Sequence, residues 1–326
     1  MMVLSSRRLA ARIALALTVV CFAAVASADN SSVGTSAYQF LKIGVGARQM
    51  GMGGANVAVG GDAQSIFWNP AGLSMVQRPE CATNYLSYFS GVNSGGAAFA
   101  QPVGKMSTVG FGLQFLRIGG IPTTTLENQT GEGLDEFAVN NLALSMGYAG
   151  QVRRRLFVGA SASYIYEGVS AFSGFSSSAG TINAGFLYRT SFHSIAFGGA
   201  VRNLGGQFSF YSLEKEDLPL TFVAGIALRP LSDDLLVAID VEKPRDNDPG
   251  ALVGVEYQPV RDFFVRTGYR AIDSRIGDDA TSNGDLAGWS FGVGVAGTRR
   301  YKIDYAYTSF ADLGDAHRFS FAYVLR

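Results

Sequence analysis

From residue 80 to the end of the chain, apolar and polar side chains alternate. In the stretch 301–308, Tyr301, Ile303, Tyr305 and Tyr307 share one face, and the residues between them share the other. Alternation with a period of two indicates β-strands, because successive side chains of a strand point to opposite faces. The segments with this pattern number about fourteen, and no long helical pattern interrupts them. We predict strands near 80–89, 93–102, 107–118, 135–149, 154–168, 179–190, 193–203, 219–229, 234–243, 250–259, 262–272, 286–297, 299–309 and 316–326.

The two faces of these segments differ in chemistry. One face is aliphatic and aromatic, and the other is glycine, serine and alanine with charges of both signs. A soluble β-sandwich would carry many lysines and glutamates on its solvent face. A transmembrane barrel instead turns its apolar face to lipid and its polar face to the lumen. Segments of about 9–11 residues also fit a tilted membrane crossing. A membrane barrel is therefore favoured over a secreted β-sandwich, which is the alternative.

The links between the predicted strands alternate in length. Short links fall near 103–106, 150–153, 190–192, 230–233, 260–261 and 298. Longer links fall near 119–134, 169–178, 204–218, 244–249, 273–285 and 310–315, and the first link, near 90–92, is the exception. Outer-membrane barrels have short periplasmic turns and longer outer loops. We therefore predict an all-β fold, a transmembrane antiparallel up-and-down β-barrel of about 14 strands over residues 80–326.

The first 28 residues have the features of an export signal. Arg7, Arg8 and Arg12 precede an apolar stretch over 13–24, and small residues lead to a predicted cleavage site after Ala28. The apolar stretch is shorter than the roughly 20 residues that a membrane-spanning helix needs. We expect the mature chain to lie in the outer membrane of a Gram-negative-type bacterium, in contact with its lipid.

Composition removes several classes of function. Lysine and arginine number 26, as do aspartate and glutamate, so the chain offers no net basic charge for nucleic acid. Two histidines, His193 and His317, are too few for a three-histidine metal site, and neither lies beside a serine pattern typical of a hydrolase. We therefore expect no cofactor, no metal and no enzymatic activity.

Residues 29–79 are rich in glycine and nearly uncharged, and they precede the first strand. We predict a hatch segment with short helices, which begins in the periplasm and enters the barrel as a plug. Asp62 is expected to cap a helix over 62–68, and Asn69 with Pro70 to start a second turn. The glycines permit tight turns and close backbone approach. Their spacing does not match a dinucleotide-binding loop.

The stretch "FLKIGVGARQMGMGGANVAVGGDAQSIFWNPAGLS" resembles the N-terminal signature of the PorV/PorQ family, a branch of the FadL-like outer-membrane proteins. The residues that carry the resemblance are Gly46, Arg48, Gly51, Met52, Gly53, Ala55, Asp62, Ala63, Asn69, Pro70, Ala71, Gly72 and Leu73. The resemblance implies a fourteen-stranded barrel with an N-terminal hatch, in agreement with the strand pattern.

The resemblance implies two different functions. PorV-like proteins serve type IX secretion by binding the C-terminal signal domains of exported cargo and passing them to a sortase. FadL-like proteins carry hydrophobic small molecules across the outer membrane. We expect the chain to bind and escort exported proteins in a pathway of the type IX kind, and passive transport of a hydrophobic molecule is the alternative.

Charges on the predicted inward faces of the late strands are candidates for a gate or a docking site for the hatch, or simply for pairing with one another. They are Asp240, Glu242, Glu256, Arg266, Arg270, Lys302 and Asp304. Ala238 falls on the same inward face, so arginine there is expected to cost less than arginine at lipid-facing Val237. Phe208, Phe210 and Tyr211 lie in the predicted outer loop 205–219. They are candidates for contact with ligand or cargo, or for packing over the barrel mouth.

Overall fold

The computed structural model describes residues 34–88, 91–130, 133–170, 175–190, 194–209, 215–230, 233–271, 286–297, 300–310 and 314–326. Four short helices come first: η1 (Gln39–Lys42), α2 (Ala47–Gly51), α3 (Ser65–Trp68) and η2 (Pro70–Met75). Fourteen strands follow: β1 (Glu80–Ser87), β2 (Val92–Val103), β3 (Ser107–Pro122), β4 (Glu136–Arg153), β5 (Leu156–Val169), β6 (Ser176–Arg189), β7 (Ile195–Ser209), β8 (Thr221–Leu228), β9 (Leu235–Pro244), β10 (Gly250–Val260), β11 (Phe263–Ala271), β12 (Trp289–Gly297), β13 (Tyr301–Ser309) and β14 (Asp315–Val324).

The strands form one closed antiparallel barrel in which each strand pairs with its neighbours in the sequence. The pairing of β1 with β14, from Glu80 opposite Val324 to Ser87 opposite His317, closes the sheet and removes its free edges. The up-and-down barrel and its number of strands are as predicted from the alternation. Each of the fourteen predicted segments overlaps one observed strand.

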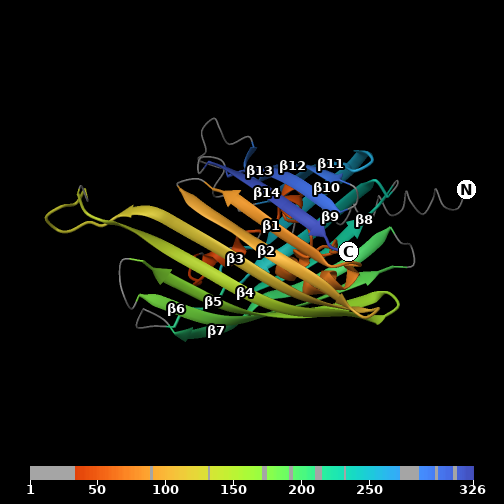
Figure 1. The fold of residues 1–326 in the computed structure, drawn as a ribbon, viewed down its shortest axis with the longest axis horizontal. Helices are drawn as coiled ribbons and strands as arrows, with labels where there is room; N and C mark the ends of the chain where they lie inside the picture. Colours follow the sequence, from red (N-terminus) through yellow and green to blue (C-terminus); the bar gives the residue numbers. More distant parts are fainter. Residues whose placement is uncertain are drawn as a thin grey trace, which may run out of the picture.

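The barrel wall is taller on one side than on the other. Strands β3 to β7 have 14 to 18 residues, whereas β8 to β14 have 8 to 11. The β3–β4 hairpin projects farthest beyond the ring, as the yellow strands in Figure 1 show. The links are mostly shorter at one end of the barrel and mostly longer at the other, so we call these ends periplasmic and outer.

In β12 the burial of side chains follows the predicted faces. Trp289, Phe291, Val293 and Val295 of β12 are exposed on the outer surface, while the alternate positions from Ser290 are buried. The outward side chains form the apolar surface that a barrel presents to lipid. Of the helices in the described part of the chain, none is long and apolar enough to cross a membrane.

Strand β7 extends farther than the sequence pattern indicates. Asn203 adopts a left-handed backbone with φ 61°, and the register between β6 and β7 shifts beside it, which marks a β-bulge. Because the bulge adds one residue, the alternation shifts by one position and Leu204 and Phe208 point outward. The strand continues to Ser209. The prediction that Phe208 lies in an outer loop was therefore wrong, because a bulge hides the true period of the strand. Phe210 and Tyr211 lie outside the described residues.

Candidate functional site

The N-terminal segment passes through the lumen from one end of the barrel to the other. At the outer end, Ala37 N donates to Asp217 O in the β7–β8 link at 2.9 Å, and the Tyr38 hydroxyl bonds to Ser177 near the outer end of β6. At the periplasmic end, the backbone at Pro70 lies against Gly159 near the start of β5. Figure 1 shows this red-to-orange segment inside the ring of strands. The prediction that it begins in the periplasm was wrong, since its first described residues lie among the outer loops.

Asp246, in the link between β9 and β10, fastens the outer part of the hatch. Its carboxylate accepts hydrogen bonds from Lys42 Nζ at 2.6 Å and from Gln39 Nε2 at 2.7 Å. The Asp246 side chain is almost completely buried. Burial alone would raise the pKa of Asp246, but the hydrogen bonds from Lys42 and Gln39 hold it below its usual value. The ionised carboxylate thus ties η1 to an outer loop.

Glycines let the hatch and the wall meet backbone to backbone. Gly53 has φ 65°, a conformation that other residues rarely adopt, and it lies against Gly268 of β11. A Cβ at Gly268 would overlap the backbone of Met52 and Gly53, and a Cβ at Gly254 would lie 2.5 Å from Met52 O. The glycine-rich stretch of the hatch and the glycines of the inner wall therefore serve one close contact.

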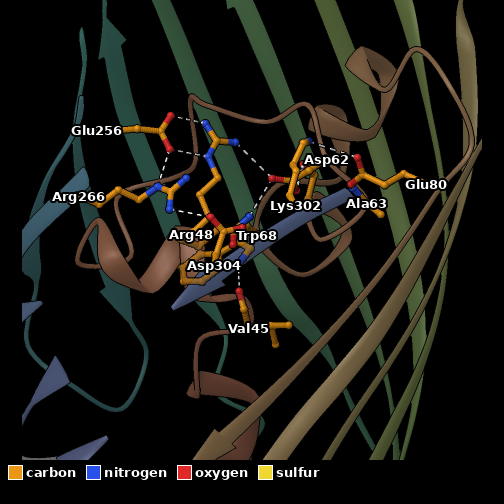
Figure 2. Close-up of polar contacts among 12 residues, drawn as sticks. Val45, Arg48, Asp62, Ala63, Trp68, Glu80, Glu256, Arg266, Lys302 and Asp304 are labelled. Atoms are coloured by element: carbon orange, nitrogen blue, oxygen red, sulfur yellow. Dashed lines mark hydrogen bonds and ion pairs between the residues drawn. The ribbon is translucent and has the colours of Figure 1, made fainter. Parts of the chain in front are cut away.

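Arg48 stands at the centre of a charged network between the hatch and the wall. Its Nε and Nη2 donate to the two oxygens of Glu256, each at 2.8 Å. Arg266 donates to Glu256 Oε2 at 2.6 Å and to Asp304 Oδ1 at 2.7 Å. Figure 2 shows these side chains converging from the hatch and from the late strands. Because each buried charge has a partner of opposite sign, the network is compatible with burial and fixes the position of the hatch.

Asp62 belongs to the same network and does not cap a helix. Its carboxylate accepts from Gln49 Nε2 at 2.9 Å and from the Ser65 hydroxyl at 3.2 Å, and it lies 3.4 Å from Arg48 Nη1. Helix α3 begins at Ser65, and no side-chain hydrogen bond caps it. The predicted cap was wrong because the Asp62 side chain turns toward the buried cations and amides of the lumen.

Two more carboxylates of the wall hold the hatch through its backbone. Asp240 Oδ2 accepts from the backbone nitrogens of Asn56 and Val57 at 2.7 and 2.8 Å. Glu80 Oε1 accepts from Ala63 N at 2.9 Å, and its other oxygen lies 3.5 Å from Lys302 Nζ. The inward charges therefore act in two ways, by pairing with each other and by satisfying backbone donors of the hatch.

Glu242 joins two further cations in the outer half of the lumen. It lies 3.2 Å from Arg202 Nη2 and 3.4 Å from Arg270 Nη1. Arg202 also stacks over the Trp68 ring at 5.7 Å, and the Trp68 indole donates to Val45 O at 2.9 Å. Beside these residues is an enclosed polar chamber of about 110 Å³ between the hatch and the wall.

The NPAGL motif, residues 69–73, closes the periplasmic side. Asn69 Oδ1 caps η2 by accepting from Ala71 N, as the sequence predicts. Gly72 packs against Gly60 and Ser65, and Leu73 lies against Gly110 of β3. These contacts place Pro70, Gly72 and Leu73 inside the periplasmic end of the barrel.

Sequence reasoning missed several residues of this site. No sequence motif includes Glu80, Arg202 or Asp246. Of these three residues, only Glu80 could have been noticed in the sequence, as a charge at the start of a predicted strand. Gly254 and Gly268 fall on inward faces, but their hatch partners are far away in the sequence. Among the described residues, no cluster of histidine, cysteine, aspartate and glutamate could hold a metal ion.

The match to a known family decides the identity. The family described as "Type IX secretion system protein PorV" matches residues 26–213, more than half of the 326 residues. The chain belongs to the PorV family. The match includes the hatch and the tall side of the barrel wall. No curated protein matches the chain.

Solved structures share the fold of this PorV-family barrel. The toluene transporter TodX of Pseudomonas putida superposes with a TM-score of 0.63 at 13% sequence identity, over 86% of this chain and 97% of TodX. A FadL homologue of Pseudomonas aeruginosa superposes with a TM-score of 0.57 at 12% identity, over 86% of this chain and 98% of that one. At such low identity these likenesses show the fold alone. Family and fold together place the protein in the outer membrane.

Proposed function

We propose that this protein binds exported proteins at the outer end of its barrel and escorts them in secretion of the type IX kind. The observation that carries the proposal is the hatch, which fills the lumen from the outer loops to the periplasmic turns in a chain that matches the PorV family. A hatch that fills the lumen in this way narrows any passage through the described part of the barrel. The candidate partners are the signal domains of cargo and a sortase.

Transport of a hydrophobic small molecule is the alternative function, and the lumen supports it less well. The polar chamber beside Glu242 holds about 110 Å³, and its lining includes Arg202, Arg270 and Lys42. Ligand pockets for small molecules usually measure about 300–1,000 Å³ and are mostly apolar. Passage of a hydrophobic ligand would therefore require the hatch to move. That movement would break the Arg48 network and the contacts of Asp240 with the hatch backbone.

Deletion of the gene tests the proposal. We expect exported proteins that share a C-terminal signal domain to accumulate in the periplasm of the deletion strain, and the wild-type gene to restore their export. Normal surface proteins together with slower uptake of toluene or a long-chain fatty acid would instead support transport. The proposed export signal is tested by sequencing the mature N-terminus, which we expect to begin at Asp29.

A further inference from the structure

Small inward residues form one continuous row across the tall side of the barrel. Ladder pairs join Ala98, Gly112, Ser145, Ser163, Thr181 and Gly205 on β2 to β7. On the inside, the Phe67 ring of the hatch lies against Gly112. Because the wall side chains along this row are small, the hatch packs close to the wall there.

On the lipid-facing surface, the same row is the floor of a groove of about 1170 Å³. Large apolar side chains border it, and none of its lining residues carries a charge: the border includes Phe111, Leu144, Met146, Tyr164, Ile182 and Leu204. The row runs from the periplasmic half of β2 to a position close to the outer end of β7. The groove therefore crosses the bilayer-facing wall obliquely toward the outer leaflet.

At its outer end the groove is bordered by an exposed aromatic ring and a lysine. Beyond the bulge at Asn203, the Phe208 ring lies over Gly180, and the side chain is 69% exposed. Lys215 Nζ lies 3.3 Å from the position that a Cβ would take on Gly206, which lines the groove. Lys215 has no hydrogen-bond or ion-pair partner among the residues that the structure describes. Within the described part of the chain, the Lys215 ammonium thus stands without a partner where the apolar groove ends.

We propose that this groove binds a membrane lipid whose phosphate headgroup has a net negative charge, with one acyl chain in the groove and the headgroup on Lys215. An apolar surface inside the bilayer is covered by acyl chains, and a cation near the membrane surface attracts anionic headgroups. A groove without other charges leaves Lys215 as the group that selects the lipid. This inference is independent of the proposed role in secretion.

A second groove on the lipid-facing wall supplies a matched control. It measures about 680 Å³, and Lys243 of β9 lines it. Unlike Lys215, Lys243 donates a hydrogen bond to Asn247 O at 2.8 Å. The two lysines therefore share a position beside a groove, but of the two only Lys243 has a hydrogen-bond partner among the described residues.

Native mass spectrometry of the full-length protein tests the proposal, with phosphatidylglycerol and phosphatidylcholine of equal chain length as probes. We expect the wild type to retain phosphatidylglycerol over phosphatidylcholine by about fivefold, which corresponds to one lysine near the headgroup. Lys215→Gln should remove this preference, and Lys243→Gln should keep it. Ala97→Phe, which fills the groove, should lower the retention of both lipids.

Three outcomes would overturn the proposal. Equal retention of both lipids by the wild type would mean that the groove holds ordinary boundary lipid. An equal loss in Lys215→Gln and Lys243→Gln would mean that the preference comes from surface charge in general. Unchanged retention in Ala97→Phe, in a variant that still migrates as a folded barrel, would place the lipid elsewhere.

Discussion

At the scale of single residues, Asn69 forms hydrogen bonds both within the hatch and between the hatch and the barrel wall. Besides its capping contact, Asn69 Nδ2 donates to Val57 O at 2.7 Å and to Phe186 O at 3.0 Å. We expect Asn69→Ala to leave the barrel folded. It should lower the free energy of unfolding by about 1 kcal/mol for the cap and about 1 kcal/mol for each other lost hydrogen bond. Urea unfolding in detergent measures the change.

The variant Asn69→Asp distinguishes the contribution of the helix cap from that of the two hydrogen bonds that Asn69 Nδ2 donates. The variant keeps an oxygen that can accept from Ala71 N, but it turns a second oxygen toward the carbonyls of Val57 and Phe186. We therefore expect a larger loss of stability than in Asn69→Ala, since a buried carboxylate would face two acceptors. A variant as stable as the wild type would contradict the assigned orientation of the amide.

Asp240 gives a second prediction at this scale. Replacement by alanine leaves the backbone N–H groups of Asn56 and Val57 buried without their acceptor. Each such group costs about 1–3 kcal/mol, so we expect faster hydrogen exchange of both amides and easier cleavage of the hatch by protease. Asp234→Ala, at an exposed position before β9, is the control and should behave as the wild type. Equal exchange in Asp240→Ala and the control would refute the anchor.

At the scale of elements, the hatch and the late strands meet through glycines. Gly268→Ala would insert a methyl group between β11 and the backbone at Met52–Gly53, which cannot turn aside as a flexible side chain can. We expect a loss of about 1–3 kcal/mol, the usual cost of overpacking, together with a displaced hatch. The hydrogen exchange of residues 50–57 measures the displacement.

Gly250→Ala is the matched control for this contact. Gly250 lies at the start of β10, and its added Cβ would meet Glu242 Cγ at an ordinary 3.5 Å. The control should therefore keep the exchange rates of the wild type. Similar rates in both variants would show that the Gly268 contact does not hold the hatch.

The elements also show where sequence reasoning succeeds and where it stops. The period of two is a local property, so the late strands and their lipid faces could be predicted. The bulge at Asn203 could not, because it depends on pairing with β6. Ala238 shows the same limit: it faces inward as predicted, yet it is fully buried in a cluster with Met52 and Leu252 of hatch and wall. Arginine at Ala238 is therefore not the mild substitution that the sequence suggests.

At the scale of the whole molecule, the course of the hatch predicts where the mature N-terminus lies. Residues 37–42 contact outer loops, so a peptide tag placed between Ala28 and Asp29 should be accessible on intact cells. A tag in the short turn at 154–155 should become accessible only after the outer membrane is permeabilised. Antibody labelling of intact and permeabilised cells measures the accessibility of each tag. Labelling of the N-terminal tag only after permeabilisation would place the segment in the opposite direction.

Removal of the hatch predicts a change in permeability. The wild-type barrel should conduct poorly in a planar bilayer, because the segment occupies the lumen from end to end. A variant without residues 35–66 should conduct, since inward glycine, serine and alanine leave a wide space once the hatch is gone. Identical closed traces from both proteins would show that the strands alone fill the barrel. Heat-modifiable migration on gels controls for folding of the variant.

The sequence by itself determined the class of the fold, the approximate strands and the family motif. These features are local, because alternation, turn residues and motif spacing depend only on residues that are close together in the sequence. Only the tertiary structure decided what the motif does. Arg48 finds Glu256 more than two hundred residues away, Asp246 fastens Lys42 from an outer loop, and Gly53 meets Gly268 across the lumen. Such contacts depend on closure of the sheet around the hatch, which brings distant residues together, and no local pattern encodes that distance.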